Sequence, residues 1–465
     1  MSELFRIEHD SMGEVEVPSE ALWGAQTQRS LVNFAISDDR IPFQLIYALA
    51  TIKQAAAITN NRLRVLDDVK RDLIVNIAGE IAQGLHNNHF PLRVWQTGSG
   101  THTNMNVNEV ISNLASKESG ELLGSHKPLH PNDDVNRSQS TNDTFPAAIH
   151  MATVQEITNK LLPQLSNLIE TFAQKSSDWK EVIKIGRTHL QDAVPITLGQ
   201  EASAWREQLA IAYSRIKEAL NELYPLPLGG TAVGTGLNAP PKFDQEIAME
   251  ISRLTDFPFC SAPNKFAIMA SHDGLVNVMS QLRLLAVALL KIVNDIRLLS
   301  CGPKAGFAEL KLPENEPGSS IMPGKINPTQ CEAMAMVCTQ VIGLDAAVAI
   351  AGSGGHLQMN SYKPLIGFNL LHSIELLHDA CKSCRTAMVE GIEPNRTKIQ
   401  NDLDQSLMLV TALTPVIGYE KASEIARLAY LQNTSLREAA TKLGYLSESE
   451  FDRLVDPRSM TIAPK

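Results

Sequence analysis

"VMSQLRLLAVALLKIVNDIRL" occupies residues 278–298, and its apolar character decides the expected fold. Only four charged side chains interrupt this stretch, namely Arg283, Lys291, Asp295 and Arg297. A helix that is apolar around most of its girth is surrounded by other helices, from its own chain or from partner subunits. The stretch therefore predicts an interior helix of a large helical bundle.

Further segments have the same helical periodicity and comparable length. At a rise of 1.5 Å per residue, helices of about 20–28 residues would each span about 30–42 Å. Helices of that length do not fit a compact single-chain bundle. We therefore expect a mainly α fold, built as an elongated bundle of long helices that oligomerises. The five expected helices cover residues 147–174, 198–223, 275–299, 329–351 and 365–389.

The segments on either side of these helices predict a three-domain subunit. Before residue 140 the helical segments are shorter and alternate with polar turns. Pro394 ends the last long helix, and Ser447 with Glu450 forms a capping box for a short helix near the C-terminus. We expect an N-terminal domain at 1–139, a central long-helix bundle at 140–394 and a small helical C-terminal domain at 395–465.

Charge and composition exclude several classes of protein. The net charge of −10, from 51 acidic and 41 basic side chains, disfavours binding to nucleic acid or to an anionic membrane. The longest unbroken apolar run, LLAVALL at 284–290, is far shorter than the ~18 residues of a membrane span. The N-terminal sequence has no apolar core typical of a signal peptide, and six scattered cysteines are typical of reduced intracellular thiols. We expect a soluble cytoplasmic protein without a nucleic-acid or membrane partner.

Two motifs imitate known sites. GGTAVGTG (229–236) has glycines at phosphate-loop spacing, but Thr235 stands where that loop requires lysine. His378, Cys381 and Cys384 are spaced like zinc ligands, but on a helix these steps spread the side chains across about 120°. We interpret the second motif as helix-face packing and expect no metal site.

Four polar segments each adjoin a helix. They read TGSGTHTNMN (97–106), HPNDDVNRSQSTND (130–143), GRTHLQDAVP (186–195) and GSSIMPGKINPTQCE (318–332). Any one of these loops is explained by turn and N-cap chemistry, because Ser, Thr, Asn and Asp are the usual capping residues. Together they favour a polar site at helix ends, where backbone N–H groups and helix dipoles attract anions.

The segment at 318–332 is expected to be a loop as far as Pro328. Gly318 and Gly324 give backbone freedom, whereas Pro323 and Pro328 lack an N–H and fix their own φ. Polar loops of this kind are more often functional than structural.

Glu332 has two open interpretations. Thr329 and Glu332 have the spacing of a capping box that begins the next helix. The same carboxylate is equally suited to orienting a histidine.

The motif at 318–328 resembles the signature of the fumarase/aspartase superfamily, a Gly-Ser-Ser run followed by Met-Pro, Lys and Asn-Pro. GRTHLQDAVP carries His189 where aspartases typically have glutamine, and LPLGGTAVGTGLN and GYLSESEFDRLV are also similar to class II fumarase segments. The likeness runs from about Pro18 to the C-terminus. It implies reversible hydration of fumarate to L-malate in the tricarboxylic acid cycle, with no metal or cofactor. It also implies a homotetramer with active sites shared between subunits.

The resemblance assigns a role to each matching residue. Ser319 would be the catalytic base and His189 the partner acid or base, supported by Glu332. The residues that would bind the dicarboxylate substrate are Ser99, Gly100, Thr101, Ser140, Thr141, Asn142, Thr188, Ser320, Lys325 and Asn327. His130, Pro131, Asn132 and Asp133 would form a second dicarboxylate site.

These residue types suit the elimination of water from malate. Removing a proton beside a carboxylate creates an aci-carboxylate with nearly two negative charges, and preorganised donors that stabilise such charge usually give the largest catalytic term. Lys325 and Asn327 are donors of that kind. Serine needs surroundings that favour its alkoxide, and histidine shuttles protons in both directions near neutral pH.

Three positions depart from the family pattern. His102 replaces a residue that is often glutamine or serine, and the segment GHLQMNSYKP (355–364) differs from the usual fumarase sequence at this place. Lys127 lies near where some members have arginine beside the second site.

Two alternative functions remain. The first is an aspartate ammonia-lyase of the same superfamily, against which His189 argues. The second is a non-catalytic structural homologue, which would be under no pressure to keep the whole constellation of motif residues.

Overall fold

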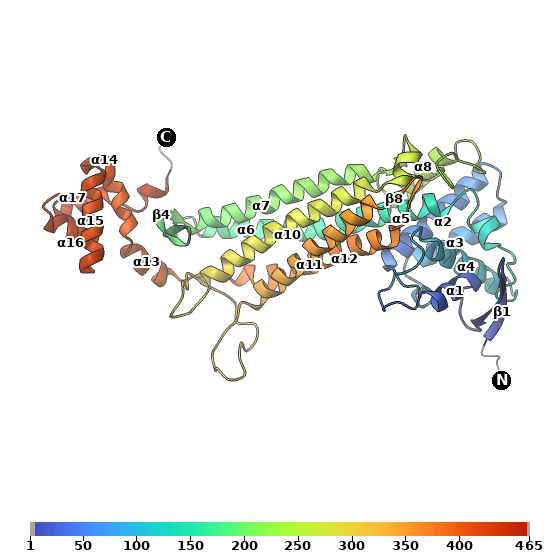
Figure 1. The fold of residues 1–465 in the computed structure, drawn as a ribbon, viewed down its shortest axis with the longest axis horizontal. Coiled ribbons are helices and arrows are strands. Elements are labelled where there is room, and N and C mark those ends of the chain that lie inside the picture. The colour runs from blue at the N-terminus through green and yellow to red at the C-terminus, as the bar shows by residue number, and fades with distance from the viewer. Residues whose placement is uncertain (1–4, 463–465) are drawn as a thin grey trace. The chain divides into compact units, whose positions relative to one another are not determined.

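The computed structural model describes residues 5–462 and divides the chain into two units. Unit 1 comprises the residues up to 163 together with 214–286 and 338–378, and unit 2 comprises 164–213, 287–337 and the residues from 379 onward. The long helices α6, α7, α10, α11 and α12 have residues in both units (Figure 1).

The predicted long helices are present. Three of them, α10 (Asp273–Leu299), α11 (Thr329–Ser353) and α12 (Lys363–Ala387), agree with the prediction to within two residues at each end. Residues 198–223 form α7 (Leu198–Ala219) and a 3-10 turn (Leu220–Leu223). Residues 147–174 are helical throughout, as predicted, with a π-helical segment (Ile157–Leu161) between α5 (Thr141–Glu156) and α6 (Leu162–Asp178).

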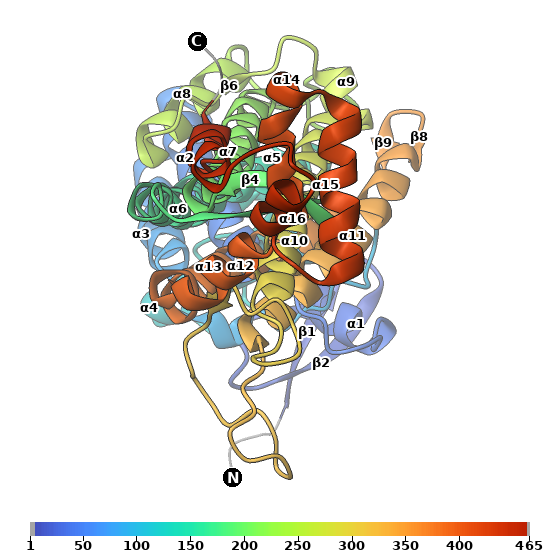
Figure 2. The ribbon, with the colours of Figure 1, turned by 90° about the vertical axis from the view of Figure 1, so that its left-hand side faces the viewer.

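Helix α10 packs against both α7 and α11. In unit 2, the indole nitrogen of Trp205 on α7 donates to Asp295 on α10 at 3.0 Å. In unit 1, Arg283 of α10 lies 2.7 Å from Asp345 of α11. Figures 1 and 2 show these helices side by side. The mainly α fold built from long helices is thereby confirmed.

Part of the apolar surface of α10 and α11 stays uncovered in the single chain. By length and composition alone both helices are long and apolar enough to cross a membrane, a property that core helices of soluble proteins share. Met336 and Ile350 on α11 are 69% and 73% exposed, and Val287 on α10 is 48% exposed. Apolar faces of this kind mark surfaces that pack against a partner.

Unit 1 is built around α2, which is largely buried and packs against α3, α5 and α8. Helix α4 is buried along nearly its whole length, although it carries several asparagines. The remaining elements are short strand pairs and flanking helices. The helices of unit 1 are α1 (Ala25–Asn33), α2 (Phe43–Arg62), α3 (Asp68–Ala82), α4 (Thr101–Glu118), α5, α8 (Phe243–Thr255) and α9 (Lys265–Ala270), and the strand pairs are β1 (Phe5–Asp10) with β2 (Gly13–Pro18), β5 (Pro225–Leu226) with β6 (Cys260–Ser261), and β8 (Gly355–His356) with β9 (Met359–Asn360).

Unit 2 contains an antiparallel hairpin that the sequence did not predict. Residues 186–195 were expected to form a loop, but β3 (Ile183–Thr188) pairs with β4 (Gln191–Thr197). A second short pair joins β7 (Leu310–Lys311) to β10 (Glu393–Pro394). The pattern at 186–195 contains Gly, Pro and polar residues that are typical of turns, so its strand character was hidden.

The C-terminal helices of unit 2 share one apolar core, to which Ile185 of β3 also belongs. Ser447 caps α17 in a capping box with Glu450, as predicted. The three-domain division at residues 139 and 394 stays a prediction. These helices are α13 (Arg396–Asp404), α14 (Thr414–Ile417), α15 (Tyr419–Gln432), α16 (Leu436–Lys442) and α17 (Glu448–Leu454).

Candidate functional site

The loop at 97–101 in unit 1 requires its glycines. A Cβ atom on Gly98 would lie 1.5 Å from the carbonyl oxygen of Ser361, and one on Gly100 would lie 2.5 Å from the ring of Phe145. Gly100 also has a φ of +81°, which glycine adopts without strain. The loop is therefore pressed against its neighbours and held in one conformation.

Two of the four predicted segments meet at the N-terminus of α4. The hydroxyls of Ser99 and Thr101 lie 2.8 Å apart. Within the next turn of α4, the amide of Asn104 donates to the Thr141 hydroxyl and to Asn136, both at 3.1 Å. Segments 97–106 and 130–143 are thus joined by buried hydrogen bonds, as the prediction of a shared polar site requires.

Ser140 begins α5 in a capping box with Asp143. The backbone N–H of Ser140 donates to Asp143 at 3.0 Å, and that of Asn142 donates to the Ser140 hydroxyl at 3.2 Å. The other carboxylate oxygen of Asp143 accepts from the backbone N–H groups of Gly229 at 3.1 Å and Thr231 at 2.9 Å. The GGTAVGTG segment is therefore a support for Ser140 and Asn142, a role that its sequence did not indicate.

Buried charges lie beneath this segment. The ammonium of Lys53 donates to the side-chain oxygens of Asn136 at 2.9 Å and Gln139 at 3.0 Å. Burial lowers the pKa of Lys53 to about 7 and raises the pKa of Asp143 to about 7. Burial also lowers the pKa of Lys363 to about 8. Uncompensated buried charge is costly, so these groups constrain the geometry of the segment.

Sequence reasoning missed Lys53, Asp143 and Lys363. One signal was present for Lys53, because a lysine in the middle of an alanine-rich apolar helix must either snorkel to solvent or be paired. No signal in the sequence linked Asp143 to the segment at 229–231, which lies more than 80 residues away.

Two of the departures from the family pattern lie beside this loop. The ring of His102 lies 3.0 Å from the Ser30 hydroxyl on α1 and packs against Phe34. Burial lowers the pKa of His102. The backbone N–H of Lys363, in the segment at 355–364, donates to the carbonyl of Gly98 at 3.1 Å. Lys363 therefore holds the loop directly, whereas His102 joins the first turn of α4 to Ser30 and Phe34.

His130 caps the π-helical turn at 131–135. Its Nδ1 accepts from the backbone N–H groups of Asn132 at 3.2 Å and Asp133 at 3.1 Å, which leaves Nε2 as the remaining ring nitrogen. The His126 ring stands edge-on to it with centroids 4.9 Å apart. A cavity of about 390 Å³ in unit 1 is lined by His126, His130, Pro131 and Asn132, among others. The exposed Lys127 does not line this cavity.

In unit 2, Thr188 and His189 lie at the tip of the β3–β4 hairpin. The two turn residues, His189 and Leu190, have φ values of 56° and 60°. A two-residue turn with two positive φ angles normally uses Asn-Gly or similar residues. Strained backbone of this kind clusters at functional sites. All three side chains are exposed in the single chain.

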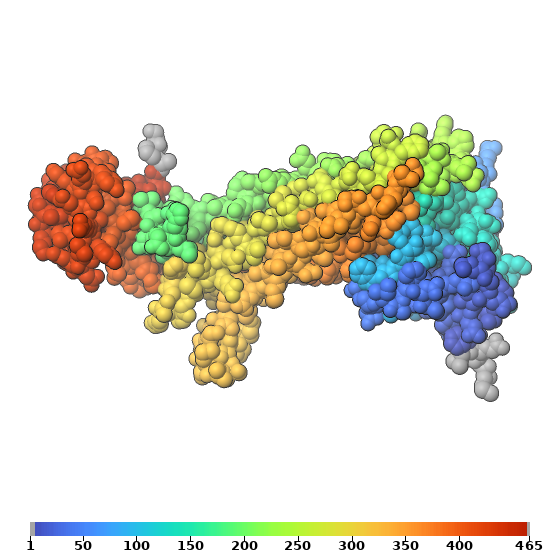
Figure 3. Space-filling view, viewed as in Figure 1, coloured from blue at the N-terminus to red at the C-terminus, as the bar shows by residue number. Residues whose placement is uncertain are grey.

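The segment at 318–328 is a loop, as predicted. Figures 1 and 3 show the chain between α10 and α11 standing away from the helices. The Ser319 hydroxyl accepts from the backbone N–H groups of Ile321 at 3.2 Å and Met322 at 3.0 Å. The loop is closed at its base, because the side chain of Asn327 donates to the carbonyl of Gly318 at 2.6 Å.

The other predicted residues of this loop are exposed. Lys325 and Ser320 both face solvent, and the backbone carbonyl of Lys325 accepts from the N–H of Gly318 at 2.9 Å. Glu332, in the first turn of α11, lies 3.4 Å from Arg297 of α10. Among the described residues, this ion pair is the side-chain contact found for Glu332, so neither a capping box with Thr329 nor a contact with a histidine is present within one chain.

The predicted catalytic residues of unit 2, His189, Ser319 and Glu332, do not contact one another in the single chain, as far as the described residues show. Among the described residues, no hydrogen bond or ion pair joins His189, Ser319 and Glu332 within one chain. His378, Cys381 and Cys384 all belong to α12, where the two cysteines are buried, in agreement with a packing role. In residues 5–462, no group of three or more His, Cys, Asp or Glu side chains is arranged to hold a metal ion.

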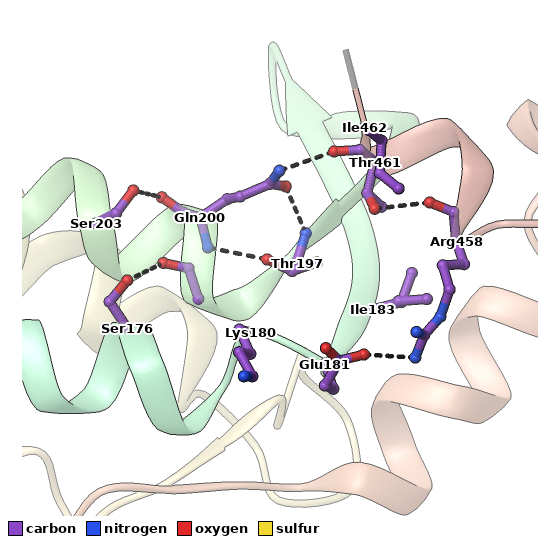
Figure 4. Close-up of a pocket in the computed structure, with 11 residues that line it drawn as sticks. Ser176, Lys180, Glu181, Ile183, Thr197, Gln200, Ser203, Arg458, Thr461 and Ile462 are labelled. Atoms are coloured by element: carbon purple, nitrogen blue, oxygen red, sulfur yellow. Dashed lines mark hydrogen bonds and ion pairs between the residues drawn. The ribbon is translucent and has the colours of Figure 1, made fainter. Parts of the chain in front are cut away.

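A separate cavity of about 360 Å³ lies at the base of the hairpin (Figure 4). Gln200 of α7 accepts from the Thr197 N–H at 2.9 Å and donates to the Thr461 carbonyl at 2.8 Å. The cavity contains none of the predicted site residues. The two hydrogen bonds of Gln200 join the base of the hairpin to α7 and to the chain near residue 461.

Comparisons with known proteins agree on one family. The Lyase family matches residues 13–343, and the Fumarase C C-terminus family matches residues 409–462. A class II fumarate hydratase of Prochlorococcus marinus is 73% identical over 100% of this chain and 99% of its own length. One from Methanosarcina acetivorans is 54% identical over 99% of this chain and 95% of its own. The crystal structure of recombinant class II fumarase from Schistosoma mansoni has a TM-score of 0.96 at 44% identity, covering 98% of this chain and 99% of that one.

Proposed function

The chain belongs to the class II fumarate hydratases, and we propose that it hydrates fumarate reversibly to L-malate with Ser319 as the base and His189 as the partner acid. It is a lyase, and its substrate is a small dicarboxylate. In the direction of malate dehydration, the Ser319 alkoxide takes the proton from the carbon beside one carboxylate. The bond to the hydroxyl oxygen then breaks, and a proton from His189 converts the departing hydroxide into water.

The surroundings of Ser319 carry this assignment. Two backbone N–H groups, those of Ile321 and Met322, point at the Ser319 oxygen. Donors to an oxygen favour its charged form and lower its pKa. A serine in this setting becomes a usable base, which a solvent-exposed serine is not. The exposed Lys325 ammonium on the same loop adds positive charge.

The substrate carboxylates are proposed to bind at the polar helix ends. The N-termini of α4 and α5 carry Ser99, Thr101 and Ser140 and offer backbone N–H groups to an anion. Lys325 and Asn327 supply further donors, and Gly100, Thr141, Asn142, Thr188 and Ser320 complete the proposed binding set.

The second dicarboxylate site is proposed at His130. With its Nδ1 accepting two backbone N–H groups, a neutral His130 carries its proton on Nε2 and is able to donate to a carboxylate. The cavity of about 390 Å³ next to it is large enough for a four-carbon diacid.

We propose that the working form is a homotetramer with active sites shared between subunits. The uncovered apolar faces of α10 and α11 support this assembly. The exposed state of His189 and of the Ser319 loop in one chain also supports it, because water-excluded surroundings strengthen electrostatic catalysis. We also propose that the protein is cytoplasmic and that each subunit has three domains.

The experiment that tests this function follows ultraviolet absorbance of purified protein with L-malate after treatment with a chelator. The double bond of fumarate absorbs, so rising absorbance reports product directly. We expect activity to survive the chelator and His189→Asn to lower kcat by about 100-fold or more. His86→Asn is a matched control, because His86 also has a positive φ (66°) but is paired with Glu80 in unit 1.

The contrary outcomes are distinct. Ammonia released from aspartate, with no product from malate, would assign the chain to the ammonia-lyases. Protein that processes neither compound would be a structural homologue. Equal rates for wild type and His189→Asn on malate would remove His189 from the mechanism.

A further inference from the structure

The β3–β4 hairpin presents Thr188 and His189 on a strained turn, and that strain raises the question of what holds the turn in place. Left-handed backbone at His189 and Leu190, with φ of 56° and 60°, persists only when the flanking structure fixes it. Seven of the nine residues of the turn and β4 are exposed or half-exposed. The restraint must therefore come from the buried face of β3.

A cluster of four charged side chains lies on that buried face. Lys184 and Glu309 are each 1% exposed, and the Lys184 ammonium lies 2.9 Å from Glu309 Oε2. That oxygen accepts no hydrogen bond of its own among the described residues, so Lys184 is what balances its charge. Glu201 on α7 lies 2.9 Å from the same ammonium, on the more exposed side of it.

Arg187 connects this cluster to the turn. Its guanidinium donates to Glu309 Oε1 at 2.7 Å and lies 4.3 Å from the centre of the Phe307 ring. Arg187 directly precedes Thr188 and is two residues from His189. A guanidinium held by both a carboxylate and an aromatic face is restrained in orientation as well as position.

An irregularity in β3 makes this double contact possible. Residues three apart on a regular strand face opposite sides of the sheet. The register shifts between Ile185 and Arg187, where a Cβ atom on Gly186 would lie 2.7 Å from the carbonyl of Val194. The bulge turns Arg187 to the same side as Lys184, so that both reach one carboxylate.

Glu309 is itself held by the backbone around it. Its N–H donates to the carbonyl of Leu299 at 2.8 Å, and its carbonyl accepts from the N–H of Asn395 at 2.7 Å. The side chain of Asn395 donates to the carbonyl of Ala308 at 2.9 Å. The Glu309 carboxylate is therefore held in place between two cations of β3, Lys184 and Arg187.

We propose that Glu309 is a positioning residue for the reaction, holding Lys184 and Arg187 so that the hairpin tip presents Thr188 and His189 in one orientation. The inference rests on the proposed function of His189. It assigns a role to a buried carboxylate that contacts neither the substrate nor His189.

The test compares Glu309→Gln with the matched control Glu201→Gln. Both changes remove one carboxylate from Lys184, but only the first removes the partner of Arg187. For Glu309→Gln we expect kcat with L-malate to fall by about tenfold or more, with KM changed by less than about threefold, because small displacements of catalytic groups act on the chemical step. We also expect the limb of the pH–rate profile that belongs to His189 to move. Glu201→Gln should leave kcat, KM and the profile within about twofold of wild type.

Hydrogen exchange separates positioning from general damage and does not depend on activity. In Glu309→Gln the backbone amides of residues 187–191 should exchange about tenfold faster, whereas those of the C-terminal helices α15 and α16 should be unchanged. If Glu309→Gln does not fold, Arg187→Lys is the second variant, because it keeps the charge but loses the planar guanidinium and its contact with the Phe307 ring. It should give the same kinetic and exchange changes.

Each outcome decides between the two proposals. An inactive wild type would contradict the function while the exchange comparison still tests the hairpin. An active wild type with both Gln variants slowed equally, or with unchanged exchange at 187–191, would overturn the role of Glu309.

Discussion

The two units of the chain carry their proposed site residues in opposite ways. In unit 1, Ser99, Thr141 and Ser140 lie at helix ends supported by buried amides and charges. In unit 2, His189 and Ser319 lie on an exposed turn and an exposed loop. Groups that bind a fixed carboxylate profit from a rigid scaffold, whereas groups that move protons must approach the substrate after it binds. The proposed binding residues of unit 1 are thus held by buried contacts, whereas the proposed proton-transfer residues of unit 2 are exposed in the single chain.

The largest effect is expected for Ser319→Ala. Removing the base should lower kcat for malate dehydration by about 1,000-fold and leave KM nearly unchanged, because general base catalysis contributes to the chemical step. Steady-state absorbance assays measure both constants. Ser353→Ala is the control, since Ser353 donates only to the Ile350 carbonyl at the end of α11. A variant retaining a tenth of the wild-type rate would contradict the assignment of chemistry to this loop.

Gly98→Ala tests the rigidity of unit 1. The added methyl group would collide with the Ser361 carbonyl, 1.5 Å from the ideal Cβ position, so the loop or its neighbour must shift. We expect the free energy of unfolding to fall by about 3 kcal/mol or more. Chemical denaturation measures it. Gly343→Ala on α11, with no atom within 4 Å of its Cβ position, should instead gain about 0.5–1 kcal/mol. Equal effects of the two changes would mean that the loop is not pressed against Ser361.

Acid should lower the free energy of unfolding through the buried His272 of unit 1. Burial lowers the pKa of His272 to about 3, and neither of its ring nitrogens has a hydrogen-bond partner among residues 5–462. Its unfolded pKa is near 6.5, so below that pH the unfolded chain binds a proton that the folded chain does not. Stability is therefore fully present above about pH 6.5 and falls as the pH drops, by up to about 1.4 kcal/mol per unit from this group.

His272→Leu should remove that contribution. Urea unfolding of the full chain at pH 7, 6 and 5 should show a shallower loss of stability in the variant than in wild type. A variant slope equal to that of wild type would mean that His272 is accessible to solvent.

The smallest effect is expected at the hairpin tip of unit 2. Leu190 has a φ of 60°, which costs a side chain with a Cβ about 1–2 kcal/mol. Leu190→Gly should therefore raise the melting temperature slightly, as a gain of about 1 kcal/mol would. The neighbouring strand residue gives the opposite result, because Gln191→Gly places glycine inside β4. Destabilisation by Leu190→Gly would show that the turn is unstrained.

Much of the fold could be predicted because it depends on local pattern. Helices α10, α11 and α12 follow from apolar periodicity, and the capping box at Ser447 follows from residue types three apart. The π-helical segment at 157–161 was not predicted, although Pro163 follows it and has no N–H for the carbonyl of residue 159. The β3–β4 hairpin was missed because its turn residues, His189 and Leu190, are not those that a two-residue turn prefers.

In the candidate site, too, some residues could be predicted from the sequence and others could not. The composition of the segments rich in Ser, Thr, Asn and Gly predicted polar loops, and the likeness to the class II fumarases assigned roles to their residues. The supports of those segments gave no such signal. Asp143 reaches Gly229 and Thr231, and Glu309 reaches Lys184 and Arg187, across separations that no periodicity spans.

The sequence by itself determined the helical class, the apolar helices, the loop at 318–328 and the family to which the chain belongs. These features depend on the order of neighbouring residues, which sets backbone preference and hydrophobic pattern. Tertiary structure alone decided that Glu332 pairs with Arg297, that Asp143 accepts from Gly229 and Thr231, and that the buried Glu309 lies between Lys184 and Arg187. Those contacts arise only when distant segments are brought within hydrogen-bonding distance, and a charge that is buried there needs a partner.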